Sequence, residues 1–324
     1  MVAFIVKRVI QACIVMVIVS CIAFAVKYSF GDPTRDMLGM SASAEARAEL
    51  RTQLGLDKPV FEQWIVFVGN VLRGNLGDSY FYREPAMDVI LSRLPATVEL
   101  VCMATLIIVC VAIPAGVYVA CNPSSLISKT IMLISMLGVS IPVFLTSMFL
   151  IYVFSIQLNL FPSFGRGEPV EILGFWTTNF TTFSNFLHIL LPSLALSSIM
   201  FPLFVRITRS DMKEALTSEY VRYAQAKGLS RKRIVWRHAF RNTLLPLVTI
   251  GGVQVGTMVA FTILTESVFQ WQGLGYMFIE AVSRADTGLL VAYLLFTSFI
   301  FVTINTLVDI IYTFIDPTIT IKGN

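Results

Sequence analysis

The sequence predicts an all-α membrane protein with six transmembrane helices. Of its 324 residues, 56% are hydrophobic and only 14% are charged, whereas soluble domains carry about 25% charged residues. The mean hydropathy is +0.76. A soluble fold of this length cannot cover so much apolar surface. The apolar residues also gather into uncharged stretches of about 20 residues, the length that crosses the hydrocarbon core of a bilayer.

Six such stretches follow one another along the chain. We predict membrane spans at residues 9–27, 99–121, 130–155, 187–207, 244–265 and 288–312. Several are interrupted by proline, namely at Pro114, Pro142, Pro202 and Pro246. Transmembrane helices tolerate proline where neighbouring groups bond the freed carbonyls, so these prolines do not argue against the spans.

The first span has a second interpretation. It also resembles a secretory signal with its cleavage site: Lys7 and Arg8 are followed by an apolar run and then by Ala23-Phe24-Ala25. The run from Val9 to Val26 is longer than the apolar region of most signals, which is about 7–15 residues. A retained helix also keeps the later loops on consistent sides. We therefore expect the first span to be retained.

The basic residues predict the orientation. The two short loops at 156–186 and 266–287 hold one basic residue each, Arg166 and Arg284. The other side holds Lys7, Arg8, Lys129, Lys322 and the ten basic residues from Arg206 to Arg241, and such an excess marks the cytoplasmic side. We predict cytoplasmic segments at 1–8, 122–129, 208–243 and 313–324, and extracytoplasmic segments at 28–98, 156–186 and 266–287. Long segments such as 28–98 translocate regardless of charge, so both termini are expected in the cytoplasm.

The long extracytoplasmic segment is expected to be partly helical. Residues 43–56 contain strong helix formers and end near Gly55, a typical helix stop. Residues 64–72 form a second short apolar stretch that suits a helix on the membrane surface.

The sequence holds no catalytic motif. It has no phosphate-binding G-x-x-x-x-G-K-[ST] loop, and its five cysteines fall in apolar runs without metal-ligand spacing. The two histidines, His188 and His238, are predicted on opposite sides of the membrane. We expect no catalytic, cofactor-binding or metal-binding residues, so that any use of ATP depends on another chain.

An ion-coupled carrier is a competing hypothesis. Such a carrier usually needs ionisable groups near the midplane of the membrane. Glu99, Glu266 and Asp309 instead lie at the ends of spans. A carrier of this class would transport as a purified single chain. A membrane-bound enzyme is disfavoured by the missing catalytic cluster.

The cytoplasmic segment 208–243 is the most informative part of the sequence. Asp211 and Glu214 resemble a capping box at a helix start, and Gly228 is a helix stop. An apolar stripe is expected from four residues spaced at four, four and three positions: Met212, Leu216, Tyr220 and Tyr223. We predict a helix–turn–helix elbow whose exposed apolar stripe docks on a partner protein.

A simpler interpretation of this segment stays open. Basic loops obey the positive-inside rule and rest on anionic lipid headgroups. The basic residues that follow the turn either orient the chain or pair with an acidic partner surface; they are Arg231, Lys232, Arg233, Arg237 and Arg241.

The same segment carries a family resemblance. The run Glu219-Tyr220-Val221-x-x-Ala224-x-Ala226-Lys227-Gly228-Leu229, followed by Arg237-His238-Ala239-x-Arg241-Asn242 and Pro246, resembles the coupling loop of ABC importer permeases, in the dipeptide/oligopeptide/nickel branch. Further matching motifs occur in order along nearly the whole chain, among them Phe30-Gly31-Asp32-Pro33, Arg93-Leu94-Pro95, Gly273-Leu274-Gly275 and Asp316-Pro317. Three departures do not change the resemblance: Glu219 for the family's Asp, Asn75 for the Asp of its Gly-Asp-Leu-Gly motif, and Gln272 for its Pro.

The resemblance implies a fold, a function and a set of partners. It implies a type I ABC importer permease fold with a core over residues 97–313, and an ATP-driven importer of di- or oligopeptides that depends on a binding protein. Nickel chelates and glutathione are alternative substrates within the branch. The implied partners are a second homologous permease, two cytoplasmic ATPase subunits that bind ATP and Mg, an extracytoplasmic solute-binding protein and the lipid bilayer of the inner membrane, with no nucleic acid.

The resemblance also assigns roles to residues. The ATPase-coupling residues are expected to be Glu219, Tyr220, Val221, Ala224, Ala226, Lys227, Gly228 and Leu229. Gly228→Ala or Gly228→Asp is expected to block coupling. In the fifth span, Gly252 and Gly256 form a small-xxx-small face. With Gln254 they are candidates for the contact with the second permease or for the solute pathway. A hydrogen bond from Gln254 to a neighbouring helix is the simpler alternative.

Overall fold

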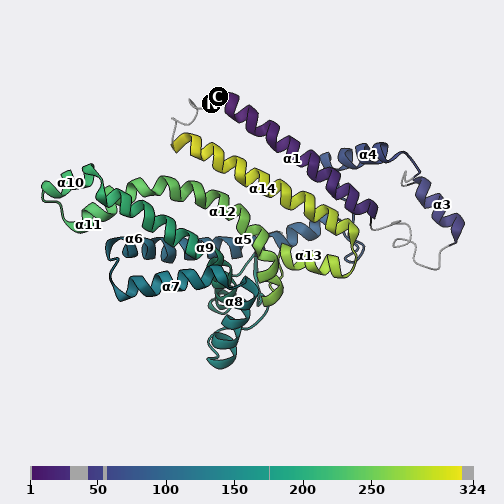
Figure 1. Ribbon diagram of the computed structural model, residues 1–324. Coiled ribbons are helices and arrows are strands. Elements are labelled where there is room, and N and C mark those ends of the chain that lie inside the picture. Colours follow the sequence, from purple (N-terminus) through teal and green to yellow (C-terminus); the bar gives the residue numbers. More distant parts are fainter. Residues whose placement is uncertain (1, 30–42, 54–56, 175, 316–324) are drawn as a thin grey trace. The chain divides into compact units, whose positions relative to one another are not determined.

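The computed structural model describes residues 2–29, 43–53, 57–174 and 176–315. Its helices and strands are α1 Val2–Ser29, α3 Ala44–Gln53, α4 Val60–Leu72, α5 Ala86–Ile107, η1 Ile108–Ala112, α6 Ile113–Cys121, α7 Leu126–Ser140, α8 Val143–Leu150, η2 Ile151–Gln157, β1 Val170–Leu173, β2 Trp176–Thr178, α9 Phe183–Thr217, α10 Glu219–Ala226, α11 Arg231–Arg233, η3 Ile234–Ala239, α12 Phe240–Phe269, α13 Leu274–Ser283 and α14 Thr287–Ile315 (Figure 1). The motifs Phe30–Pro33 and Asp316–Pro317, and the helix stop at Gly55, lie outside the described residues.

Five described helical stretches are long and apolar enough to cross a membrane. They are Val6–Tyr28, Ala86–Cys121, Phe183–Thr217, Arg231–Phe269 and Thr287–Val308. A sixth candidate is the helix pair Leu126–Gly138 and Val143–Gln157, which is bent by 117°. The protein is therefore a mostly helical membrane protein with five to six candidate spans, as the sequence predicts.

The expected span at 130–155 is divided rather than continuous. The break falls at Ile141, which has an extended backbone (φ −94°, ψ 122°), and at Pro142 (φ −58°, ψ 142°). Proline disfavours the α conformation in the residue before it and has no N–H to donate. Pro142 therefore ends α7 and begins α8. Pro114 distorts its helix less. The stretch Ala86–Cys121 stays helical through it, and the local change is the π turn η1 directly before α6.

The chain forms two compact units. Unit 1 comprises the described residues of Met1–Leu94 and Tyr276–Leu307, and unit 2 those of Pro95–Gly275 and the end of α14 from Val308. In unit 1, α1 contacts α4, and a small buried cluster joins Ala23 of α1 to Val291 and Leu295 of α14. The rings of Phe24 and Phe67 lie 5.8 Å apart at this contact. The two short helices α3 and α4 occupy the stretches in which the sequence predicts helices.

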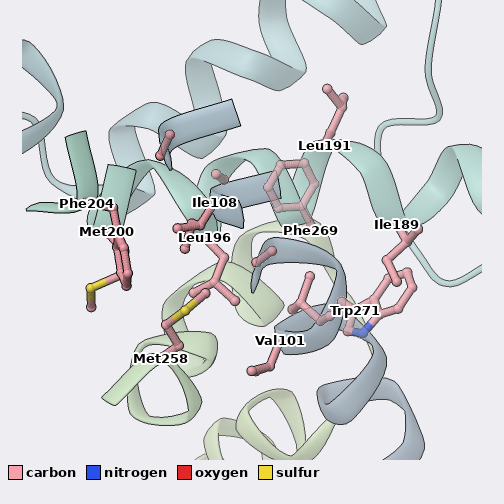
Figure 2. Close-up of a cluster of buried hydrophobic side chains, with 14 of the residues drawn as sticks. Val101, Ile108, Ile189, Leu191, Leu196, Met200, Phe204, Met258, Phe269 and Trp271 are labelled. Atoms are coloured by element: carbon pink, nitrogen blue, oxygen red, sulfur yellow. The ribbon is translucent and has the colours of Figure 1, made fainter. Parts of the chain in front are cut away.

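Unit 2 is organised around the long helix α9. This helix packs against α6, α7, α8 and α12 (Figure 1). Figure 2 shows the main buried cluster, whose side chains come from α5, η1, η2, α9 and α12 and from the turn after α12. Trp271 is fully buried there, with Ile189 and Leu196. Burying an aromatic or aliphatic side chain of this size contributes about 1.5–3 kcal/mol, so this cluster fixes the helices that carry the functional segments.

Two features differ from the sequence prediction. α9 continues without interruption from Phe183 to Thr217, so the predicted helix start at Asp211 and Glu214 is wrong. Because no proline or glycine occurs between Pro202 and Ser218, nothing ends the helix earlier. The second feature is a short antiparallel hairpin of β1 and β2 inside the loop 156–186, which the sequence did not predict.

Candidate functional site

The predicted coupling segment forms an elbow, here defined as residues 218–233. α9 ends at Thr217, and the extended backbone of Ser218 (φ −68°, ψ 157°) separates it from α10. α10 spans Glu219–Ala226, and Ser230 precedes the single turn α11. The chain then returns through η3 into α12. The elbow is therefore a short helix between two long helices of unit 2.

Gly228 makes the turn of the elbow. Its φ is +73°, in the left-handed region. The Gly228 N–H donates to the Gln225 carbonyl at 2.9 Å, and the Leu229 N–H donates to the Ala224 carbonyl at 3.3 Å. This pair of bonds is the Schellman motif, which closes a helix through a left-handed glycine. A Cβ added at Gly228 would meet nothing within 4 Å, so only the backbone conformation, and not crowding within the chain, requires glycine.

One face of α10 is buried against the rest of unit 2. Val221 is fully buried and Ala224 is 4% exposed. They pack in a cluster with Met212 and Ala215 of α9, Val117 of α6, and Ile234, Val235 and Ala239 of η3. Leu229 packs against the same cluster. These contacts hold the elbow in place by apolar burial.

The opposite face of α10 is open. Tyr220 is 41% exposed and Tyr223 is 64% exposed. Glu219, Ala226 and Lys227 are exposed with them. The Lys227 ammonium lies 4.5 Å from the centre of the Tyr223 ring, a cation–π contact. The eight predicted coupling residues are therefore divided: Val221, Ala224 and Leu229 hold the elbow, and the other five face outward.

The predicted apolar stripe is wrong as a single exposed face. Met212 is fully buried and lies on α9 with Leu216, whereas Tyr220 and Tyr223 lie on α10. The break at Ser218 changes the direction of the chain, so a spacing counted through it does not describe one helix face. Only the two tyrosines of the stripe belong to the outward surface.

The basic residues after the turn are exposed. The Arg231 guanidinium donates to the Cys121 carbonyl at 2.9 Å and so satisfies a carbonyl at the C-terminal end of α6. Arg231 thus bonds within the chain. Lys232, Arg233, Arg237 and Arg241 are exposed on the same stretch.

The second group of predicted site residues lies on α12. Gly252 and Gln254 line a largely apolar cavity of about 380 Å³, together with residues of α5, η1, α9 and α14. A Cβ at Gly252 would come within 2.5 Å of the Val308 side chain. The Val308 side chain, in the same unit, therefore already leaves room only for glycine at 252. Gly256 is buried and does not line this cavity.

The loop 156–186 is held by a buried ion pair that the sequence analysis missed. The Arg166 guanidinium lies 3.1 Å from Glu99 Oε2, and the two side chains are 6% and 4% exposed. Arg166 also donates to the Thr177 hydroxyl and carbonyl, each at 2.7 Å. The Asn179 N–H donates to Glu99 at 3.2 Å. These bonds fasten the strand β2 and the start of the loop to α5.

A second buried carboxylate lies nearby in unit 2. Glu266 is fully buried and accepts the Thr97 hydroxyl at 2.7 Å and the Gly275 N–H at 2.8 Å. The indole of Trp271 donates to the Ala96 carbonyl at 2.9 Å, and the Arg166 guanidinium lies 5.7 Å from the Trp271 ring centre. We call the bonds of Glu99, Arg166, Thr97, Glu266 and Trp271 the outer network. The sequence signal for it was a lone arginine in a loop and two carboxylates at span ends.

Unit 1 contains a smaller polar cluster. The Asp286 carboxylate accepts the Ser79 hydroxyl at 2.5 Å and the Phe81 N–H at 3.1 Å. The Tyr82 hydroxyl donates to Glu280 at 2.7 Å, and Glu280 pairs with Arg284 at 3.0 Å. Burial raises the pKa of the Tyr82 phenol, and the hydrogen bond to Glu280 raises it further. This cluster joins the segment before α5 to α13 and the start of α14.

Among the residues that the structure describes, no group of three His, Cys, Asp or Glu side chains could hold a metal ion. An exposed elbow, an apolar cavity and five to six candidate membrane spans fit the transport subunit that the resemblance implies.

The comparisons with known proteins agree with this class. A family model described as "Binding-protein-dependent transport system inner membrane component" matches residues 112–321, and the model of its N-terminal part matches residues 1–101. The chain belongs to this family. It is 38% identical over 302 residues to the di/tripeptide transport system permease protein DppB of Pseudomonas aeruginosa, covering 89% of this chain and 90% of that protein. It is 32% identical over 323 residues to the glutathione transport system permease protein GsiC of Shigella flexneri, covering 99% and 100%.

A solved structure supports the fold. The structure of the MetNI methionine ABC transporter in inward-facing conformations matches with a TM-score of 0.56 and 16% sequence identity, covering 71% of this chain and 97% of that chain. The family model and the relatives at 32% and 38% identity confirm the resemblance to an ABC importer permease. The protein is a multi-pass inner-membrane permease subunit that carries no catalytic site or cofactor. The ATPase subunits and the binding protein of the importer are separate partners.

Proposed function

We propose that this chain is one of two homologous permease subunits of an ATP-driven importer of di- and oligopeptides. The family supplies the importer class, and the name of the Pseudomonas relative supports peptides as the substrate. In this proposal two cytoplasmic ATPase subunits bind ATP and Mg, and the elbow of each permease docks on one of them. Both chain termini lie on the ATPase side, and the core of residues 97–313 forms half of the pathway.

The observation that carries this proposal is the division of the elbow into a buried and an open face. Val221 and Ala224 anchor α10 to α9, α6 and η3. The motion of a partner seated on Tyr220 and Tyr223 would therefore pass to the long helices rather than bend a loose loop. A membrane-surface helix is the competing interpretation, and it needs a continuous apolar face. α10 presents tyrosines beside Glu219, Arg222, Gln225 and Lys227, which suits a protein partner better.

Site-specific crosslinking tests the docking. In a background without the five native cysteines, Ala226→Cys is expected to crosslink to an ATPase subunit, because Ala226 is exposed on the outward face. Leu72→Cys is the control, since Leu72 is exposed at the end of α4 in the predicted extracytoplasmic segment. A crosslink from residue 72, or none from residue 226 in the assembled importer, would count against the assigned role.

We also propose that Gln254 borders the solute pathway. It supplies one of the few polar groups in the wall of the α12 cavity, and amide side chains can exchange hydrogen bonds with a passing peptide. Gly252 and Gly256 serve this pathway or the contact with the second permease by allowing close packing. Gln254→Cys should react with a water-soluble thiol reagent faster during ATP turnover than at rest. An unchanged rate would argue against a place on the pathway.

Uptake assays test the substrate class. The importer is reconstituted in proteoliposomes with its binding protein, and accumulation of a radiolabelled dipeptide and of glutathione is measured with ATP. We expect dipeptide accumulation that disappears when the phosphate-binding loops of the ATPase subunits are disabled. The Shigella relative makes glutathione the second candidate. Accumulation of nickel chelates instead of either peptide would refute the peptide proposal.

A further inference from the structure

A hollow on unit 2 has no role in the function described so far. It is lined by side chains of α7, α9 and α12 and has a volume of about 660 Å³. We call it the basic hollow. Its lining residues are Met132, Leu203, Arg206, Ile207, Arg209, Ser210, Asp211, Lys213, Pro246 and Ile250.

The polar part of the hollow is positively charged. Arg206, Arg209 and Lys213 are spaced at three and four residues along α9, so they lie on one face of the helix. Asp211 is the single carboxylate of the lining. Three cations and one carboxylate leave a net charge of two positive units. In the part of the chain that the structure describes, none of the three cations makes an ion pair.

The remaining wall of the hollow is apolar. Leu203 and Ile207 come from α9, Met132 from α7, and Pro246 and Ile250 from α12. One cation is turned toward this wall, since Arg209 Nη1 lies 3.7 Å from Met132 Sδ. The hollow is therefore amphipathic, with guanidinium and ammonium groups beside a hydrocarbon surface.

The position along α9 matches the depth of a lipid headgroup. The uncharged part of the helix, 183–205, has about 23 residues and a length of about 35 Å at 1.5 Å per residue. The hydrocarbon core of a bilayer is about 30 Å thick. Arg206 is the first charged residue after this stretch, so it and the next two turns fall where phosphate groups lie. Leu203 and the α12 residues fall at the level of the acyl chains.

We propose that the basic hollow binds one anionic phospholipid. The lipid phosphate contacts Arg206, Arg209 and Lys213, and the first part of an acyl chain lies on Leu203, Ile207 and Ile250. Basic pockets between transmembrane helices on the cytoplasmic side suit anionic headgroups. A free phosphate ion would leave the apolar wall without a ligand, so the occupant is a lipid.

Native mass spectrometry of the assembled importer tests this site. The complex is titrated with phosphatidylglycerol in mild detergent, with phosphatidylethanolamine as the neutral competitor. The variant is R206Q/R209Q/K213Q. The matched control is K232Q/R233Q/R237Q, which removes three exposed cations of the same basic segment that do not line the hollow. Each basic residue near an anionic headgroup contributes roughly fivefold in affinity. The first variant should therefore bind phosphatidylglycerol about 100-fold more weakly.

The outcomes separate the alternatives. Loss of affinity in the first variant with affinity kept in the control supports the site. An equal loss in both variants would mean diffuse adsorption to basic residues, and no loss in either would mean no site; both overturn the proposal. If the first variant keeps its lipid but loses a partner subunit, the hollow holds an acidic protein segment and the proposal is wrong. Displacement of the lipid by inorganic phosphate would also overturn it.

A second measurement needs no variant. Phosphatidylglycerol with a photoreactive acyl chain is added to the unmodified importer and the crosslinked peptides are mapped. Crosslinks are expected at Leu203, Ile207, Pro246 or Ile250, and the matching phosphatidylethanolamine probe should label these positions at least several-fold less. Labelling confined to other segments, or equal labelling by both lipids, would overturn the proposal.

Discussion

The charged residues at the two ends of unit 2 differ in burial and in pairing. In the outer network, Glu99 and Arg166 are buried, paired and bonded to the chain around them. At the elbow and the basic hollow, Lys227, Arg206 and Lys213 are exposed and make no ion pair within the described part of the chain. The charges of the outer network form bonds within the chain. Charges at the second end are available to partners and lipid.

The largest expected effect comes from breaking the outer network. Arg166→Gln leaves the Glu99 carboxylate buried without its cation, which typically costs about 3–5 kcal/mol. We expect a correspondingly large loss of thermal stability in detergent-solubilised importer. Arg284→Gln is the control, because the Arg284–Glu280 pair is 44% and 24% exposed and exposed pairs contribute about 0–1 kcal/mol.

The double variant sharpens this test. If the loss in Arg166→Gln comes from an unpaired buried charge, Glu99→Gln/Arg166→Gln should recover part of it, since two neutral amides carry a smaller desolvation cost. A double variant that is less stable than the single one by a full second increment would contradict the pairing.

The elbow should show a smaller effect, divided between its two faces. Val221→Ala removes two fully buried methyl groups from the cluster with Met212 and Ile234, and should destabilise the protein by about 1–3 kcal/mol. Tyr223→Ala changes an exposed residue and should stay within about 0.5 kcal/mol. Transport should fall in the tyrosine variant despite its normal stability. Equal stability losses in both would mean that α10 has no open face.

This division shows what the sequence could and could not predict. Hydropathy identified the stretches that form the candidate spans, because the membrane acts on each stretch separately. The turn at Gly228 was predictable for the same reason, since a left-handed glycine is a local requirement. The burial of Met212 was not, because it depends on α6 and η3 packing against α9.

The outer network is the clearest case of information that local patterns lack. Glu99 and Arg166 are 67 residues apart in the chain, and Thr97 and Glu266 are 169 apart. No periodicity or spacing links such positions. Glu99 and Glu266 were predicted as residues at span ends, but Glu99 lies within the candidate span Ala86–Cys121, where the loop 156–186 covers it. The grouping of Met132, Arg209 and Pro246 around the basic hollow has the same long-range origin.

Variants at Gly228 distinguish the backbone conformation of the turn from a contact between the turn and an ATPase subunit. Gly228→Ala should cost about 1–2 kcal/mol from the left-handed backbone alone, because its Cβ meets no atom within 4 Å. Gly228→Asn should cost less, since asparagine tolerates this conformation. If glycine serves only the turn, ATP-driven transport should recover in Asn relative to Ala. If an ATPase subunit packs against the turn, both variants should lose transport, the larger side chain more, while their thermal stabilities still follow the backbone order.

The smallest expected effect concerns Tyr82 of unit 1. Its side chain is half-buried, so its exposure is intermediate between that of the outer network and that of the elbow. Burial, and next the hydrogen bond to Glu280, raise its pKa above the ordinary value of about 10, while Arg93 acts in the opposite direction. A pKa raised on folding means that the folded state holds the proton more tightly. The stabilisation is therefore complete below pH 10 and is lost as the pH rises through the folded-state pKa.

Thermal stability should fall above pH 10 more steeply in the parent protein than in Tyr82→Phe, and the tyrosinate absorbance lost in that variant should titrate above pH 10. A difference titration centred at or below pH 10 would show that folding does not raise the pKa of Tyr82, and would contradict this prediction.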